Sequence, residues 1–423
     1  MRRFFALALV LSTALAGCAE KPPGDGGPPP VLGEGDAGSL DALPAGDYTA
    51  TIETSKGMIV VELWEDKAPL HVANFLQYAE QAHYDGTIFH RVVKDFVIQG
   101  GGFSAPFSAT SQPRETLAPI PVEVWPGSTH DEGTLGMART QDPDSATSQW
   151  FISTQRNTNL DSGYTAFGKV TSGIEVVRAI EAVAVGSRGQ HQNVPVDDVT
   201  ITKVTVATPG GGARPSAAAP AGSYGVASGG KVSVPVIVRN VGGARAAATL
   251  AATGDGVSVS VLREPGDLSA GYTGVGIVEF AAGAGFQGGE ATITASLGGG
   301  TDTVRIVLRP VTSTDVAGTA NPKVSMRYVG LYDNGVVFDT TSTDLDDRGF
   351  DMASRWREHA EALKVWVGDG ETADQDYTPV IAGFKAGVLG LKEGETRTVR
   401  LSPEEGYQDG RWRVFEMSVV SID

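Results

Sequence analysis

The sequence is poor in three kinds of residue that define common protein classes. Cys18 is its single cysteine, so no disulfide can form within the 423-residue chain. None of the six histidines pairs with another at the spacing of metal ligands. Lys and Arg number 33 against 50 Asp and Glu, and the net charge of −17 argues against a nucleic-acid partner. We therefore expect no disulfide scaffold, no metal site and no nucleic-acid binding.

The N-terminus carries a targeting pattern. Arg2 and Arg3 precede an apolar run, residues 4–15, that is too short to span a membrane and is typical of a secretory signal. The following Leu-Ala-Gly-Cys resembles a bacterial lipobox, which implies cleavage before Cys18 and its lipidation. Residue 19 is not aspartate, which by resemblance to sorting rules implies the outer membrane, facing the periplasm. The alternative is a fortuitous cysteine at the end of an ordinary signal.

Composition divides the rest of the chain. A length of 423 residues predicts two to four domains. Residues rich in Pro, Gly and Asp after Cys18 predict a disordered tether, and 13 of the 14 residues in 209–222 are Gly, Pro, Ala or Ser, which predicts a linker. The predicted parts are a signal peptide (1–17), the tether (18–46), a first domain (47–208), the linker (209–222), a second domain (223–314) and a third domain (315–423).

One stretch of the first domain combines a strand pattern with polar groups. Residues 89–99 alternate apolar and polar positions, and three glycines follow. Arg91 lies on the polar side of this predicted strand, and a turn at residues 94–95 lets Phe96 and Gln99 join the same surface. From the pattern alone, the segment could also be plain sheet core with a solvated arginine.

The motifs in this domain resemble those of the cyclophilins, which are peptidyl-prolyl isomerases. The stretch F-H-R-V-x-x-x-F-x-I-Q-G-G-G-F is followed at the family's spacing by G-T-L-G-M-A-R, D-S-A-T-S-Q-W-F-I and Y-T-A-F-G-K-V. The resemblance covers about residues 47–207. It implies a closed eight-stranded antiparallel β-barrel with two helices, which helical spacing places after Pro69 and at 173–183.

The implied reaction needs no cofactor, because no bond is made or broken. Amide resonance sets a barrier of about 18 to 20 kcal/mol, and a catalyst must bind the twisted amide better than either planar isomer. By resemblance, Arg91 donates a hydrogen bond to the twisted nitrogen and Gln99 holds Arg91 and the substrate backbone. The implied apolar cup for the proline ring consists of Phe96, Val97, Phe151, Leu160 and Tyr164. The implied groove for the peptide backbone consists of Ala138, Arg139 and Gln149. Tyr164 and Arg139 are the residues found in bacterial periplasmic cyclophilins.

The second domain has the pattern of an all-β sandwich. Short alternating runs, such as 232–238 and 291–297, recur every 8 to 14 residues between glycines and Asp-Gly pairs. They predict an immunoglobulin-like β-sandwich that serves as a spacer or adhesive module.

The third domain resembles the FKBP family, an unrelated class of prolyl isomerase in which a sheet wraps one short helix. The resemblance rests on a hairpin with an Asn334-Gly335 turn, a V-I-x-G-F segment at 380–384 and an S-P-x-x-x-Y turn at 402–407. The implied pocket residues are Tyr328, Phe338, Asp339, Ile381, Phe384, Tyr407 and Phe415. Two departures leave its activity open: an insertion in which 352–363 predicts an amphipathic helix, and a shortened loop after Tyr407. The alternative is a module that binds unfolded chains but isomerises them poorly.

Together these patterns predict a multidomain, mainly β protein with isomerase activity. We expect it to act as a monomer on proline-containing polypeptides, assisting the folding of exported proteins from a lipid anchor at Cys18 in the cell envelope. The alternative from another class is a holdase or adhesive scaffold in which neither pocket turns over. An arginine turned away from its pocket, or paired with an acid, would contradict the isomerase mechanism.

Overall fold

The structure is a computed structural model, and it covers the three predicted domains. It describes residues 37–42, 46, 48–313, 317, 323–342, 345, 348, 350–358, 361–367, 378–407 and 411–422. The predicted signal peptide, Cys18 and most of the predicted tether lie outside the described residues. Within those residues, no helix combines the length and apolar character needed to cross a membrane.

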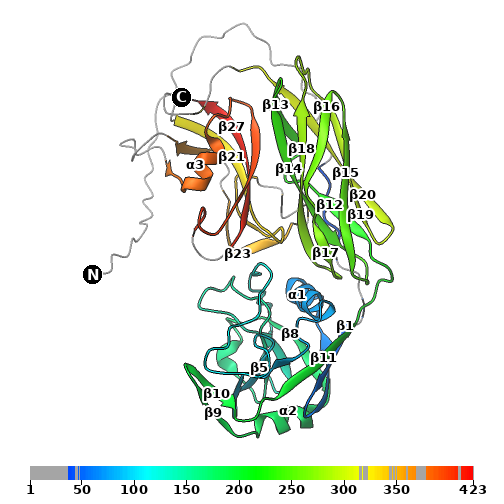
Figure 1. The fold of residues 1–423 in the computed structure, drawn as a ribbon, viewed down its shortest axis with the longest axis vertical. Helices are drawn as coiled ribbons and strands as arrows, with labels where there is room; N and C mark the ends of the chain where they lie inside the picture. Colours follow the sequence, from blue (N-terminus) through cyan, green and yellow to red (C-terminus); the bar gives the residue numbers. More distant parts are fainter. Residues whose placement is uncertain are drawn as a thin grey trace, which may run out of the picture. The chain divides into compact units, whose positions relative to one another are not determined.

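The first domain is one strongly curved antiparallel sheet with two helices (Figure 1). The strand order is β3-β11-β1-β2-β8-β6-β7-β5-β4. Only residues 89–90 separate β3 from β4, so the chain itself connects the two ends of the sheet, as in the predicted barrel. The nine strands replace the predicted eight because two short pieces, β3 and β4, follow each other. The elements are β1 (Tyr48–Thr54), β2 (Gly57–Leu63), α1 (Pro69–Glu80), β3 (Thr87–Ile88), β4 (Arg91–Val93), β5 (Val97–Gly100), β6 (Thr134–Met137), β7 (Trp150–Ser153), η1 (Thr158–Leu160), β8 (Ala166–Ser172), α2 (Ile174–Glu181), β9 (Val185–Arg188), β10 (His191–Pro195) and β11 (Thr200–Ala207).

The core of this domain follows from the alternation of its strands. Alternate residues of β1 and β2, such as Ile52 and Ile59, are buried in one cluster with Phe75 of α1 and Trp150 of β7. Pro69 occupies the first turn of α1, where its missing N–H costs no hydrogen bond. This apolar filling makes the barrel a rigid support for residues on its outer surface.

The second domain is the predicted sandwich of two sheets around one core. The sheets have the orders β12-β14-β18-β16 and β13-β20-β19-β15-β17. The strands are β12 (Pro215–Ala218), β13 (Ser223–Ala227), β14 (Lys231–Asn240), β15 (Ala246–Gly254), β16 (Val257–Arg263), β17 (Gly266–Leu268), β18 (Thr273–Ala282), β19 (Gly289–Leu297) and β20 (Gly300–Val311).

Two segments predicted to be unstructured contribute to this region. β12 lies inside the predicted linker and pairs antiparallel with β14, where small residues such as Ala217 are fully buried. Leu40, in the predicted tether, is also buried, and the Ala219 N–H donates a hydrogen bond to the Ala37 carbonyl over 2.8 Å. The small residues that suggested a linker instead allow backbone segments to pack closely.

The third domain is a seven-stranded sheet that packs on one helix, as predicted (Figure 1). Its elements are β21 (Lys323–Tyr332), β22 (Val337–Thr340), β23 (Met352–Glu358), β24 (Leu363–Trp366), β25 (Thr378–Pro379), α3 (Ala382–Val388), β26 (Thr396–Leu401) and β27 (Arg413–Ile422). The predicted helix over 352–363 is wrong, because β23 runs parallel to β22 and β24 begins at Leu363. Pairing along β22 and the burial of Ala353 outweigh the helical spacing of the apolar residues.

Candidate active sites

A row of directly opposed residues crosses four strands of the first domain. Arg91 of β4 faces Gln99 of β5, Gln99 faces Phe151 of β7, and Phe151 faces Gly136 of β6. Opposed residues of an antiparallel sheet project from the same face. Asp95 adopts a left-handed φ of 56° in the turn between β4 and β5, which brings Phe96 to this face as the sequence predicted.

Gln99 connects Arg91 to the neighbouring loop through two hydrogen bonds. The Arg91 Nη1 donates to Gln99 Oε1 over 3.3 Å, and the Gln99 Nε2 donates to Gln149 Oε1 over 3.0 Å. The Arg91 Cζ also lies 5.7 Å from the centre of the Phe96 ring. These contacts orient the guanidinium while Gln99 occupies only one of its five N–H donors.

An apolar cup adjoins this guanidinium. Val97, Phe151 and Leu160 are buried together, and Phe96, Ala138 and Tyr164 pack against them with partly exposed surfaces. The Phe151 and Tyr164 rings meet edge to face with centres 6.1 Å apart. The structure thus brings all five predicted cup residues into one cluster, beside the predicted groove residue Ala138.

The environment of Arg91 strengthens its electrostatic effect. Arg91 is half-buried, and burial lowers the pKa of its guanidinium from the ordinary value. Within the described part of the chain, Arg91 pairs with no carboxylate. A charge that is partly removed from water and not neutralised by an acid acts strongly on a nearby dipole.

Two residues of this site carry no role in the sequence-based prediction. His130 stacks on Phe151 with ring centres 5.7 Å apart, and burial lowers the pKa of the His130 imidazole. Gly136 leaves space for the Phe151 ring, since a Cβ there would lie 2.3 Å from Phe151 Cζ. The motif G-T-L-G-M-A-R contains Gly136, but only the cross-strand register shows what its missing side chain allows.

Arg139, predicted to line the peptide groove, has a clear structural contact. Its Cζ lies 4.4 Å from the Tyr164 ring centre, and its Nε donates to the Gly163 carbonyl over 2.8 Å. Arg139 therefore holds Tyr164 and its loop in place. Its contact with substrate stays a prediction.

The predicted pocket residues of the third domain form a chain of aromatic contacts. Tyr328 meets Phe384 edge to face at 5.6 Å, Phe384 meets Phe415 at 5.1 Å, and Phe415 meets Phe338 at 5.5 Å. Tyr407 lies 6.5 Å from Phe338 and is 52% exposed. Of the two remaining predicted residues, Ile381 is the N-cap of α3 and packs on this core, and Asp339 follows Phe338 on β22.

Two parts of the chain match known protein families. Residues 49–206 match the family described as cyclophilin type peptidyl-prolyl cis-trans isomerase/CLD. Peptidyl-prolyl cis-trans isomerase cyp18 of Streptomyces antibioticus is 47% identical over 166 residues, which cover 37% of this chain and 98% of that protein. The chain belongs to the cyclophilin-type peptidyl-prolyl isomerases. Peptidyl-prolyl cis-trans isomerase B of Escherichia coli is 44% identical to this cyclophilin over 164 residues, which cover 37% of this chain and 98% of that protein. Residues 316–414 match the family described as FKBP-type peptidyl-prolyl cis-trans isomerase.

The predicted enzyme class is therefore confirmed. This cyclophilin is a peptidyl-prolyl cis-trans isomerase with a second, FKBP-type domain, and it acts on proline-containing polypeptides. The predicted multidomain, mainly β architecture is confirmed as well. The individual roles of the site residues stay predictions.

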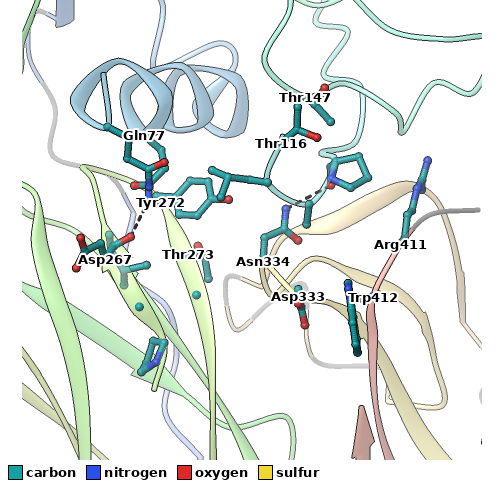
Figure 2. Close-up of a pocket in the computed structure, with 18 of the residues that line it drawn as sticks. Gln77, Thr116, Thr147, Asp267, Tyr272, Thr273, Asp333, Asn334, Arg411 and Trp412 are labelled. Atoms are coloured by element: carbon teal, nitrogen blue, oxygen red, sulfur yellow. Dashed lines mark hydrogen bonds between the residues drawn. The ribbon is translucent and has the colours of Figure 1, made fainter. Parts of the chain in front are cut away.

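A cavity of about 900 Å³ lies elsewhere in this cyclophilin (Figure 2). Its lining includes Gln77 of α1, Tyr272 and Trp412, and none of the predicted residues of either isomerase pocket. Arginines that line it are paired with aspartates, as in the contact of Arg411 Nη2 with Asp142 Oδ2 over 2.6 Å. We therefore do not assign the isomerase reaction to this cavity.

Proposed function

We propose that Arg91 catalyses isomerisation by donating a hydrogen bond to the proline nitrogen of the twisted amide. The nitrogen lone pair is delocalised in the planar amide and becomes an acceptor only when the bond twists. A donor fixed beside the cup therefore stabilises the transition state more than either planar isomer. The observation that supports this role is the half-buried Arg91 guanidinium beside the apolar cluster, held by Gln99.

The cup and the groove bind different parts of the substrate. The apolar cluster of Val97, Phe151 and Leu160 takes the proline ring by desolvation, and Gln149, which accepts a hydrogen bond from Gln99, binds the flanking backbone. No step involves a nucleophile or a proton transfer. The barrier falls because the fixed Arg91 guanidinium stabilises the lone pair of the proline nitrogen, which is localised only while the amide bond is twisted.

We further propose that the substrates are exported proteins during folding. Uncatalysed proline isomerisation takes tens to hundreds of seconds and limits folding. The chain should accelerate the slow, proline-limited refolding phase of a model protein when present at about one-hundredth of its concentration, and R91A should abolish most of this acceleration. Equal rates with and without Arg91, combined with reduced aggregation at equimolar amounts, would favour the alternative of a holdase or scaffold.

We also propose that the chain is anchored in the cell envelope through a lipidated Cys18, at the outer membrane facing the periplasm. The support is the apolar run 4–15 followed by Leu-Ala-Gly-Cys. Once attached, the acyl chains would hold the protein at the membrane, because each buried methylene contributes about 0.8 kcal/mol to membrane binding. In bacteria fed labelled palmitate, the label should follow the wild-type chain and be lost from C18A. The label should also remain with the outer-membrane fraction. Labelling of C18A equal to that of wild type would contradict the anchor.

A further inference from the structure

A guanidinium group lies among the aromatic rings that are predicted to form the pocket of the FKBP-type domain. Arg413 precedes Phe415 by two residues on β27, so both side chains project from the same face of the strand. The Arg413 Cζ lies 4.5 Å from the centre of the Tyr407 ring, 5.3 Å from that of Phe338 and 5.6 Å from that of Tyr332. Two of these three rings belong to the predicted proline pocket.

Arg413 is enclosed by its surroundings. The residue is only 3% exposed, and its Nη1 donates a hydrogen bond to the Arg411 carbonyl over 3.1 Å. Stacking on several aromatic faces away from water is the geometry in which a cation binds aromatic rings most strongly. The guanidinium is therefore held among these rings by contacts on several sides.

The two pockets of the protein use arginine in opposite ways. Arg91 of the cyclophilin domain is half-buried, lies beside its cup and contacts the Phe96 ring from outside the apolar cluster. Arg413 is buried and lies among the rings themselves. A proline ring needs the apolar faces of its pocket, and a guanidinium already in contact with Phe338 and Tyr407 excludes it from them.

Arg413 is the first residue of β27 and follows Tyr407 by six residues. Residues 408–412 alone connect Tyr407 to β27, so the strand begins close to the pocket. We propose that Arg413 is a built-in plug of the FKBP-type pocket, and that this pocket takes proline peptides only when the Arg413 side chain leaves it. The plug goes beyond the function proposed for Arg91 and does not depend on it.

The test uses full-length chains and a short proline peptide in an isomerase assay. R91A is combined with R413A, so that activity from the second pocket is measured above a low background. We expect R91A/R413A to isomerise the peptide about tenfold faster than R91A or better, because the plug's contacts are lost. The double variant should also bind the peptide, as shown by broadening of the peptide's proline NMR signals.

A matched control removes another arginine that stacks on an aromatic ring. Arg400 on the neighbouring β26 lies 3.8 Å from the Trp412 ring centre and pairs with Asp333. Because R400A removes the same kind of contact without opening the rings of the pocket, R91A/R400A should keep the rate of R91A.

Several results would contradict the proposal that Arg413 plugs the pocket. One is a rate of R91A/R413A equal to that of R91A, in a variant with an unchanged unfolding temperature. Another is a slower rate, since Arg413 would then assist the pocket. If R413A lowers the unfolding temperature, R413Q, which keeps a planar polar group without the charge, takes its place in the same comparison. If R91A alone keeps the parent's rate, the role proposed for Arg91 fails, while the step from R91A to R91A/R413A still reports on the plug.

Discussion

Replacing Arg91 by alanine should lower kcat/KM for a proline peptide by about 10²- to 10³-fold, the usual effect of removing one preorganised donor from a catalytic site. The loss should appear in kcat, because the proposed hydrogen bond forms only with the twisted amide. Peptide affinity should change little, since the apolar cluster that binds the proline ring is untouched. Single-turnover exchange of the two isomers, measured by NMR at saturating peptide, separates these two quantities.

The conservative variant R91K makes this prediction sharper. Lysine keeps the charge but lacks the planar fork that Gln99 holds in place, so R91K should recover only part of the activity. R178A is a matched control, because Arg178 lies on α2, is 41% exposed and pairs with Glu132 and Glu181. Its activity should equal that of wild type. A loss in R91A that appears as weaker peptide binding with unchanged kcat would assign Arg91 to ground-state binding.

The site could be predicted where its residues follow one another along a strand and a turn. Alternation and the predicted turn at residues 94–95 placed Arg91 and Gln99 on a common face, and the structure pairs them across β4 and β5. The aromatic residues of the cyclophilin pocket lie within motifs whose spacing is specific, whereas Phe415 of the third domain lies outside the motifs that suggested the FKBP family. Composition was a weaker guide, because the small residues of β12 were expected in a linker, although the same residues allow close strand packing.

The parts that could not be predicted depend on contacts between distant segments. His130 supports Phe151 from a loop that carries no motif, and Arg413 reaches the Phe338 ring only because β27 lies near β22 through β21. The apolar residues around Met352 have helical spacing, but pairing with β22 turns them into a strand. Local spacing alone does not show which strand a segment will meet.

Adding one methyl group at Gly136 should reduce activity nearly as severely as changing a residue that contacts substrate. The Cβ of alanine would lie 2.3 Å from Phe151 Cζ, well inside van der Waals contact. The Phe151 ring is confined by His130 on one side and Tyr164 on another, so it must move into the cup or force β6 and β7 apart. We expect kcat/KM to fall about tenfold or more and the free energy of unfolding to fall by about 1 to 3 kcal/mol, the usual cost of overpacking.

The control and the rescue distinguish this clash from a general effect of alanine. Gly186 on β9 has nothing within 4 Å of its added Cβ, so G186A should match wild type in both measurements. F151L makes room for the methyl group, so G136A/F151L should lose less stability than the sum of the two single variants, because the two positions share one space. Stability is read from denaturant unfolding followed by loss of isomerase activity, which reports on the cyclophilin domain. Strictly additive losses of stability, or a fully active G136A, would show that the Phe151 ring does not depend on the space at Gly136.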